Sequence, residues 1–316
     1  MKSNMAHSIS IQSRFRGCLL GLAVGDGLGG RFEGMDRHWI AKRYRTPQQL
    51  IENPPTTTLS YTDDTQMMIG VAEALYEDKE IIEKTLCQKF VVNYVPSRGY
   101  GRGARRVIEA MEDNKDYHAV ACSYFPGGSY GNGAAMRVAP VGLFFLNNLE
   151  SVSSQAYLSA LPTHTHQQGI EGAQILAVAI AIACSMNEWN KSLFYDKLIP
   201  HCQSPEFNKQ IEKARRITCV EDLIMLGNAI TAIESVPTAI ASFSLNPHSF
   251  TKAVGHVILI GGDTDTIAAM TGALSGAFLG IDAIPQNLLK SIENEGKGRD
   301  YIDGLAKNLA DMYQST

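Results

Sequence analysis

Two short segments combine neighbouring carboxylates with hydroxyl side chains. The first is "SYTDDT" (60–65) and the second is "GGDTDT" (261–266). Each is followed by apolar and small residues, so each is typical of a helix start, where carboxylates are stabilised by the partial positive charge of the N-terminus. One acidic helix start is ordinary. Two helix starts with the same alternation of carboxylate and hydroxyl oxygens indicate that both belong to one functional site.

Carboxylate and hydroxyl oxygens are the ligands that hard cations such as Mg²⁺ prefer, and bridging carboxylates permit two ions a few ångströms apart. The candidate ligands are Thr62, Asp63, Asp64, Asp263, Asp265 and Thr266. The alternative is two independent, solvated helix caps with no special affinity. No His or Cys pair at ligand spacing occurs outside "PTHTH" (162–166), which disfavours zinc. We therefore predict two Mg²⁺ ions, with Mn²⁺ as the alternative metal.

A glycine-rich segment, "GGSYGNG" (127–133), precedes the apparent helix "AAMRVAPVGLFF". Backbone N–H groups at such a loop favour an anion such as a phosphate, and Tyr130 could stack on a base or a ribose face. A plain turn is the alternative. The two histidines of "PTHTH", spaced by two, would point to opposite sides of an extended segment, so at most one faces a given ligand. The segment "GDGLGG" (25–30) follows a helical pattern rather than a strand, which argues against a dinucleotide-binding fold.

Helical periodicity occurs almost throughout the chain, and strict two-residue alternation is rare. We expect an all-α protein with helices over 15–25, 66–76, 81–94, 103–112, 132–147, 169–186, 206–215, 221–242, 249–260, 264–279 and 286–312. The polar and glycine-rich breaks between them, including 25–34, 60–65, 126–137 and 261–266, are expected to be loops or helix starts that together form one site.

Composition limits the class of protein. The chain has 316 residues, 45% hydrophobic and 19% charged, with a net charge of -4, which favours a globular core and argues against binding to a nucleic-acid backbone. No linker or repeat divides it, so we expect one domain over 1–316 with a flexible N-terminus over 1–13. Six scattered cysteines, no secretory signal and an apolar stretch (173–186) shorter than the roughly 20 residues of a membrane span predict a cytoplasmic protein.

Six segments, in chain order, resemble the ADP-ribosylglycohydrolase family: "RFRGCLLGLAVGDGLGGRFEG", "YTDDTQM", "RGYGRG", "GSYGNGAAMRVAP", "SVPTAI" and "GGDTDTIAAMTGALSGAFLG". The resemblance covers about residues 14 to 282. It is closer to the branch that removes ADP-ribose from serine and degrades poly(ADP-ribose) than to the arginine-directed branch.

The resemblance implies a single compact orthogonal helical bundle with a two-Mg²⁺ centre. It matches the six acidic-motif residues to metal ligands, and Glu33 in "GRFEG" to a glutamate on a mobile loop beside the metals. The ADP-ribose-binding loop corresponds to Gly128, Ser129, Tyr130, Gly131 and Asn132, and a histidine near the substrate phosphates corresponds to His164. His166 departs from the serine-directed branch, since "THTH" is closer to other branches.

We therefore expect a Mg²⁺-dependent hydrolase that cleaves the ribose anomeric bond of serine-linked ADP-ribose, poly(ADP-ribose) or O-acetyl-ADP-ribose. Such cleavage passes through an oxocarbenium-like state. Glu33, or the metal-bound carboxylate of Asp64, would move the proton, although Glu33 could instead be a solvated loop residue. The alternatives are an arginine-directed hydrolase and an inactive ADP-ribose-binding protein of the same fold. Intact metal-matching positions argue against the inactive form. The expected partners are ADP-ribosylated proteins or ADP-ribose-containing small molecules, bound by a monomer.

Overall fold

The computed structural model describes residues 9–315, which are built from helices and contain no β-strand. Three isolated β-bridges are the only strand-like pairings in this range. The prediction of an all-α fold is confirmed. Residues 1–8 of the N-terminal segment expected to be flexible lie outside the described range, and the first helix already begins at Ile11.

The α-helices are α1 (Ile11–Gly29), α2 (Arg37–Ala41), α3 (Pro47–Glu52), α4 (Asp63–Asp78), α5 (Glu83–Asn93), α6 (Arg102–Glu112), α7 (Tyr117–Tyr124), α8 (Ala139–Phe144), α9 (Leu149–Ala160), α10 (Gln167–Ser185), α11 (Lys191–Leu198), α12 (Pro205–Arg216), α13 (Ala232–Leu245), α14 (Phe250–Leu259), α15 (Thr264–Leu279), α16 (Gln286–Ser291) and α17 (Arg299–Ser315). Short 3₁₀ helices are η1 (Pro96–Arg98), η2 (Ile199–His201), η3 (Val220–Leu226) and η4 (Ile281–Ala283).

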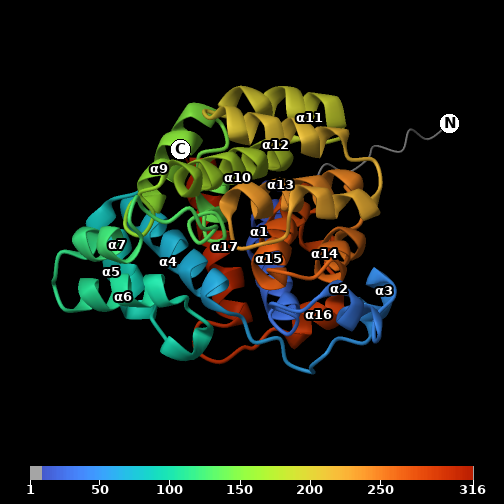
Figure 1. The fold of residues 1–316 in the computed structure, drawn as a ribbon, viewed down its shortest axis with the longest axis horizontal. Helices are drawn as coiled ribbons and strands as arrows, with labels where there is room; N and C mark the ends of the chain where they lie inside the picture. The colour runs from blue at the N-terminus through green and yellow to red at the C-terminus, as the bar shows by residue number, and fades with distance from the viewer. Residues whose placement is uncertain (1–8, 316) are drawn as a thin grey trace.

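Helices α1 and α15 lie side by side at the centre of the molecule (Figure 1). The face of α1 that meets α15 has a glycine at every fourth position: Gly17, Gly21, Gly25 and Gly29. A Cβ atom built on Gly21 would lie 2.4 Å from the backbone oxygen of Gly272, so the two backbones touch directly. This contact fixes the end of α1 beside the start of α15, and the site is built at that junction.

Helix α10 packs against α15 and contains a long apolar stretch. Its length and composition would suffice to cross a membrane, but 89% of that apolar stretch is buried inside the fold, as in the core helix of a globular protein. One continuous hydrophobic core runs from Phe15 to Ala310, and a smaller cluster joins α5, α6 and α7. The last three lie together at one side of the molecule (Figure 1).

The helix predicted over 132–147 is wrong. Residues 133–137 form turns, and α8 begins only at Ala139. Pro140 explains the delay, because proline lacks an N–H and is tolerated only in the first turn of a helix. The glycine-rich loop therefore does not lead directly into a helix N-terminus, and that argument for anion binding fails at this position.

Two other long predictions are each divided by glycine. The segment 221–242 contains η3 and α13, separated at Gly227, whose φ of 94° interrupts a helix of L-residues. The segment 286–312 contains α16 and α17, separated by a loop that includes Gly296 at φ 58°. Helices α2, α3, α7, α9 and α11 were not predicted, and all but α9 have eight residues or fewer, too few to show a clear apolar period.

The segment 25–34 was expected to be a loop or a helix start, but 25–29 are the last residues of α1. Its glycines do not break the helix here, since they allow the close contact with α15. Only 30–34, which carry Glu33, form the turn after the helix.

Candidate active site

A cavity of about 410 Å³ opens where the two acidic motifs meet. Its lining includes, among the residues predicted for the site, Glu33, Asp63, Asp64, Ser129, Gly131, Asn132, His164, Asp263, Asp265 and Thr266. Thr62, Gly128 and Tyr130 are not part of the lining. Segments far apart in the sequence thus form one cavity that holds the carboxylates of both motifs.

Helix starts position both acidic motifs. Thr62 is the N-cap of α4, and its hydroxyl oxygen accepts from the N–H of Asp64 at 3.4 Å. Asp263 is the N-cap of α15, but its side chain makes no capping hydrogen bond. Helix capping therefore explains why Thr62 is at the start of α4. It does not explain the Asp263 carboxylate, which makes no capping hydrogen bond.

The turn after α1 brings Glu33 to the second motif. The N–H of Gly34 donates to the oxygen of Gly262 at 2.8 Å, and the N–H of Gly262 donates to the oxygen of Met35 at 3.0 Å. As a result, carboxylate oxygens of Glu33, Asp263 and Asp265 lie within 4.8 Å of one another, a spacing that suits a shared cation.

Burial and mutual repulsion raise the pKa of these carboxyl groups. Burial is the larger cause for Asp63, whose pKa rises to about 7, and the charge of Asp26 adds to it. Burial, followed by the charge of Asp263, raises the pKa of Asp265 to about 9. The pKa of Asp64 is also raised, chiefly by burial. Such a cluster holds its negative charge at neutral pH only when a cation compensates it.

The donor set fits a hard divalent cation. Asp64, Asp263 and Asp265 are each less than a tenth exposed, and the buried Oδ2 of Asp64 has no hydrogen-bond partner. An unpaired buried carboxylate oxygen is costly unless an ion occupies it. Two independent, solvated caps would leave these groups in water and apart, so the structure contradicts that alternative.

The glycine-rich loop is tied to the second acidic motif through Asn132. The side-chain Nδ2 of Asn132 donates to Asp263 Oδ2 at 2.5 Å and to Ser235 Oγ at 3.1 Å. Gly128, at φ 89°, belongs to a turn closed by its own N–H on the oxygen of Phe125. Tyr130 is 52% exposed, beside the cavity rather than within it. The loop thus combines a plain turn at its start with a site wall at its end.

The two histidines of "PTHTH" face different surroundings, as their spacing predicts. His164 lines the cavity, and its Nδ1 lies 2.7 Å from Thr163 Oγ1. Burial, with the nearby Arg137 charge as a second cause, lowers the pKa of His164 to about 3, so the ring is neutral at physiological pH. His166 instead caps α10, and its ring meets that of Tyr130 edge-on at 5.9 Å.

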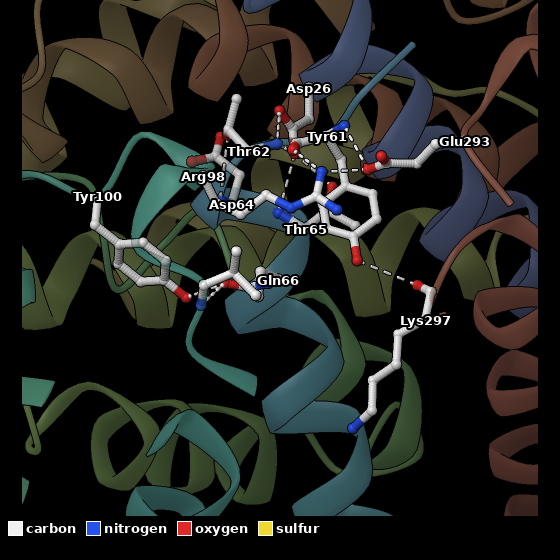
Figure 2. A network of polar contacts seen from close by, with 11 residues as sticks. Asp26, Tyr61, Thr62, Asp64, Thr65, Gln66, Arg98, Tyr100, Glu293 and Lys297 are labelled. Atoms are coloured by element: carbon white, nitrogen blue, oxygen red, sulfur yellow. Dashed lines mark hydrogen bonds and ion pairs between the residues drawn. The ribbon is translucent and has the colours of Figure 1, made fainter. Parts of the chain in front are cut away.

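Two arginines outside the predicted site are held by the protein itself. Arg137 is almost fully buried and donates to the backbone oxygen of Ser159 and to Thr163 Oγ1, both at 2.9 Å. Arg98 donates to the backbone oxygen of Tyr61 at 2.7 Å and pairs with Glu293 (Figure 2). Both therefore brace segments that carry site residues.

Two features of the site were not predicted from the sequence. An apolar wall adjoins the carboxylates and is lined by Met67, Val107, Tyr124, Phe125 and Met136. A buried carboxylate, Asp26, lies beneath the first motif and binds its backbone. The polar residue in "GDGLGG" was the available signal for Asp26, but it was assigned to a loop.

Comparisons with known proteins identify the family of this chain. A model of the ADP-ribosylglycohydrolase family matches residues 7–316. Proteins named ADP-ribosylhydrolase ARH3 are similar over 96% of this chain: the one from Homo sapiens is 33% identical with 94% of its length covered, and the one from Danio rerio is 33% identical with 92% covered.

A solved structure titled ADP-ribosylglycohydrolase-related protein complex shares the fold, with a TM-score of 0.72 at 24% identity, over 96% of this chain and 99% of that one. The sequence matches extend through both acidic motifs and the helices that carry them. The chain therefore belongs to the ADP-ribosylglycohydrolase family and is an ADP-ribosyl hydrolase.

Proposed function

We propose that this hydrolase is Mg²⁺-dependent and releases ADP-ribose by cleaving the ribose anomeric bond of serine-linked ADP-ribose, poly(ADP-ribose) or O-acetyl-ADP-ribose. The observation that carries the proposal is the meeting of both acidic motifs and Glu33 in one cavity, where carboxylate oxygens of Glu33, Asp263 and Asp265 lie within 4.8 Å of one another. The ARH3 relatives, similar over nearly the whole chain, support this branch of the family.

The metal would be held by Thr62, Asp63, Asp64, Asp263, Asp265 and Thr266. When bound, Mg²⁺ supplies Lewis-acid activation of water and a positive template for ribose hydroxyls. Asn132 orients Asp263 through its 2.5 Å hydrogen bond, so the glycine-rich loop and the metal ligands are placed together. Mn²⁺ has the same preference for oxygen ligands and is expected to substitute.

Glu33 is the candidate for proton transfer, with Asp64 as the second. Glu33 lines the cavity, and part of its side chain is exposed to solvent. Partial desolvation of its carboxyl group, followed by the charge of Asp263, raises the pKa of Glu33. A carboxyl group with a raised pKa is suited to exchange a proton near neutral pH. Exposure alone would also fit a solvated loop glutamate, but its carboxylate oxygen lies within 4.8 Å of those of Asp263 and Asp265.

His164 is placed to bind the diphosphate of the ligand as a neutral donor. Thr163 Oγ1 already accepts from Arg137, so its own proton is available for Nδ1 of His164. The proton of the neutral ring then sits on Nε2, which lies on the side of the glycine-rich loop. Ser129, Gly131 and Asn132 line the cavity next to this nitrogen, and the apolar wall beside Phe125 suits a purine.

The test is ADP-ribose release from serine-linked, arginine-linked and polymeric substrates and from O-acetyl-ADP-ribose, with Mg²⁺, with Mn²⁺ and with chelator. We expect metal-dependent release from the serine-linked or polymeric substrate, abolished in Asp63→Ala. Release from the arginine-linked substrate alone would assign the other branch. ADP-ribose binding without release from any substrate would leave a binding protein.

We also propose a monomeric, cytoplasmic protein. All six cysteines are free, and four of them are buried or partly buried, which fits a reducing compartment. Size-exclusion chromatography with light scattering would test the oligomeric state.

A further inference from the structure

Asp26 is a fully buried carboxylate that lines no part of the cavity. It lies on α1, one residue after Gly25 in the stretch that contacts α15, and its exposed fraction is 0%. No cation is paired with it among the described residues. A buried charge without a counter-ion needs several hydrogen bonds to persist, so its acceptor contacts are informative.

Among the described residues, the donors that reach the Asp26 carboxylate come from the N-cap and first turn of α4 (Figure 2). The N–H of Thr62 lies 3.0 Å from both carboxylate oxygens. Oδ2 also accepts from the N–H of Thr65 at 3.1 Å and from its hydroxyl at 2.5 Å. Asp26 therefore forms hydrogen bonds with both ends, Thr62 and Thr65, of the four-residue segment that carries Asp63 and Asp64.

Capping alone does not explain this arrangement. The N–H groups at a helix start lack intrahelical partners, but Thr62 already supplies a capping oxygen to Asp64. A second, charged acceptor beside two further carboxylates adds repulsion rather than relieving it. Such a cost is offset when cations occupy the cavity on the other side of Asp63 and Asp64.

We propose that Asp26 is a positioning residue, which fixes the backbone of the first acidic motif so that Asp63 and Asp64 present their carboxylates to the metal. This inference rests on the proposed metal-dependent function. Glu293 holds the residue just before this segment, since its carboxylate accepts from the N–H of Tyr61 at 3.2 Å. The motif is thus fastened on two sides, and Asp26 is the contact directly beneath the ligands.

The test is Mn²⁺ binding to the chelator-treated full chain, measured by titration calorimetry. We expect Asp26→Asn, which keeps the volume and removes the charge, to raise the Mn²⁺ Kd by about 10- to 100-fold, as for other residues that orient metal ligands. Thr65→Val removes one donor and should raise the Kd about 2- to 10-fold. Thr65→Ser keeps the hydroxyl and should bind as the wild type does. If Asp26→Asn does not fold, the Thr65 pair decides.

Glu171 offers a matched control. It is a buried carboxylate on α10 that accepts from the N–H of Gln203 at 2.8 Å and of Ser204, the N-cap of α12, at 2.9 Å. Glu171→Gln should lower the melting temperature of the metal-free protein but leave the Mn²⁺ Kd unchanged. An unchanged Kd in folded Asp26→Asn, or an equal rise in Glu171→Gln, would overturn the inference. A wild-type chain that binds no Mn²⁺ would overturn the metal-dependent function itself.

Discussion

Asn132 Nδ2 lies 2.5 Å from Asp263 Oδ2, and this hydrogen bond joins the glycine-rich loop to the second acidic motif across 131 residues of sequence. It makes the orientation of a candidate metal ligand depend on the loop that is proposed to bind the substrate.

Asn132→Ala should therefore lower kcat/KM more than Ser235→Ala does. Removing a hydrogen bond to a charged group costs about 1.5–3 kcal/mol, so we expect kcat/KM to fall roughly 10- to 100-fold. Ser235→Ala removes the other partner of Asn132, at 3.1 Å, and should cost at most about 1 kcal/mol. Steady-state kinetics of both variants with Mg²⁺ would test this, and equal losses would contradict the ordering.

Glu33→Gln should separate chemistry from metal binding. The amide keeps the size of the side chain but cannot exchange the proton, so kcat should fall about 10²- to 10⁴-fold. Because the six other ligands remain, the Mn²⁺ Kd should change by less than about tenfold. Kinetics and calorimetry on the same preparation check both expectations. A variant that keeps full kcat would identify Glu33 as a solvated loop residue.

The stability of the metal-free protein should fall as the pH rises. The pKa of Asp63 is raised from 3.8 to about 7 in the fold, mainly by burial. The folded chain therefore holds a proton that the unfolded chain releases, and this stabilisation is complete below the unfolded pKa and lost as the pH rises through the folded pKa. The melting temperature of chelator-treated protein should drop between about pH 4 and 7.

One variant and one ligand test whether Asp63 and the metal ligands cause this pH dependence. Asp63→Asn should flatten the pH dependence of the melting temperature of the metal-free protein, because it removes one titrating group. Mg²⁺ should raise the melting temperature of the wild type more at high pH than at low pH, since the ligands must be deprotonated to bind it. A metal-free stability that rises over the same pH range would show that other groups dominate.

Gly21→Ala should destabilise the protein, because its Cβ would lie 2.4 Å from the backbone oxygen of Gly272 and would force α1 away from α15. We expect a loss of about 1–3 kcal/mol in the free energy of unfolding. Gly304→Ala in α17 is the matched control, since nothing lies within 4 Å of its Cβ position. That change should stabilise the protein by about 0.5–1 kcal/mol. Denaturant unfolding of the two variants should therefore give opposite signs.

The sequence by itself determined the helical class and most of the polar residues of the site. Apolar periodicity predicted α15 at 264–279, and its start at Thr264 is where the structure begins it. The repeated carboxylate and hydroxyl pattern indicated one site, and the structure brings both motifs to one cavity. These features are local, so residue type and spacing suffice to predict them.

Only the tertiary structure decided how the motifs meet and what supports them. The glycines at 25–29 suggested a loop locally, yet they form the end of α1, because packing against α15 favours residues without a side chain. Asp26, in the same stretch, becomes a buried acceptor for the start of α4, because α1 and α4 pack together. Contacts between distant helices depend on which surfaces approach within a few ångströms, and local spacing along the chain carries no record of that distance.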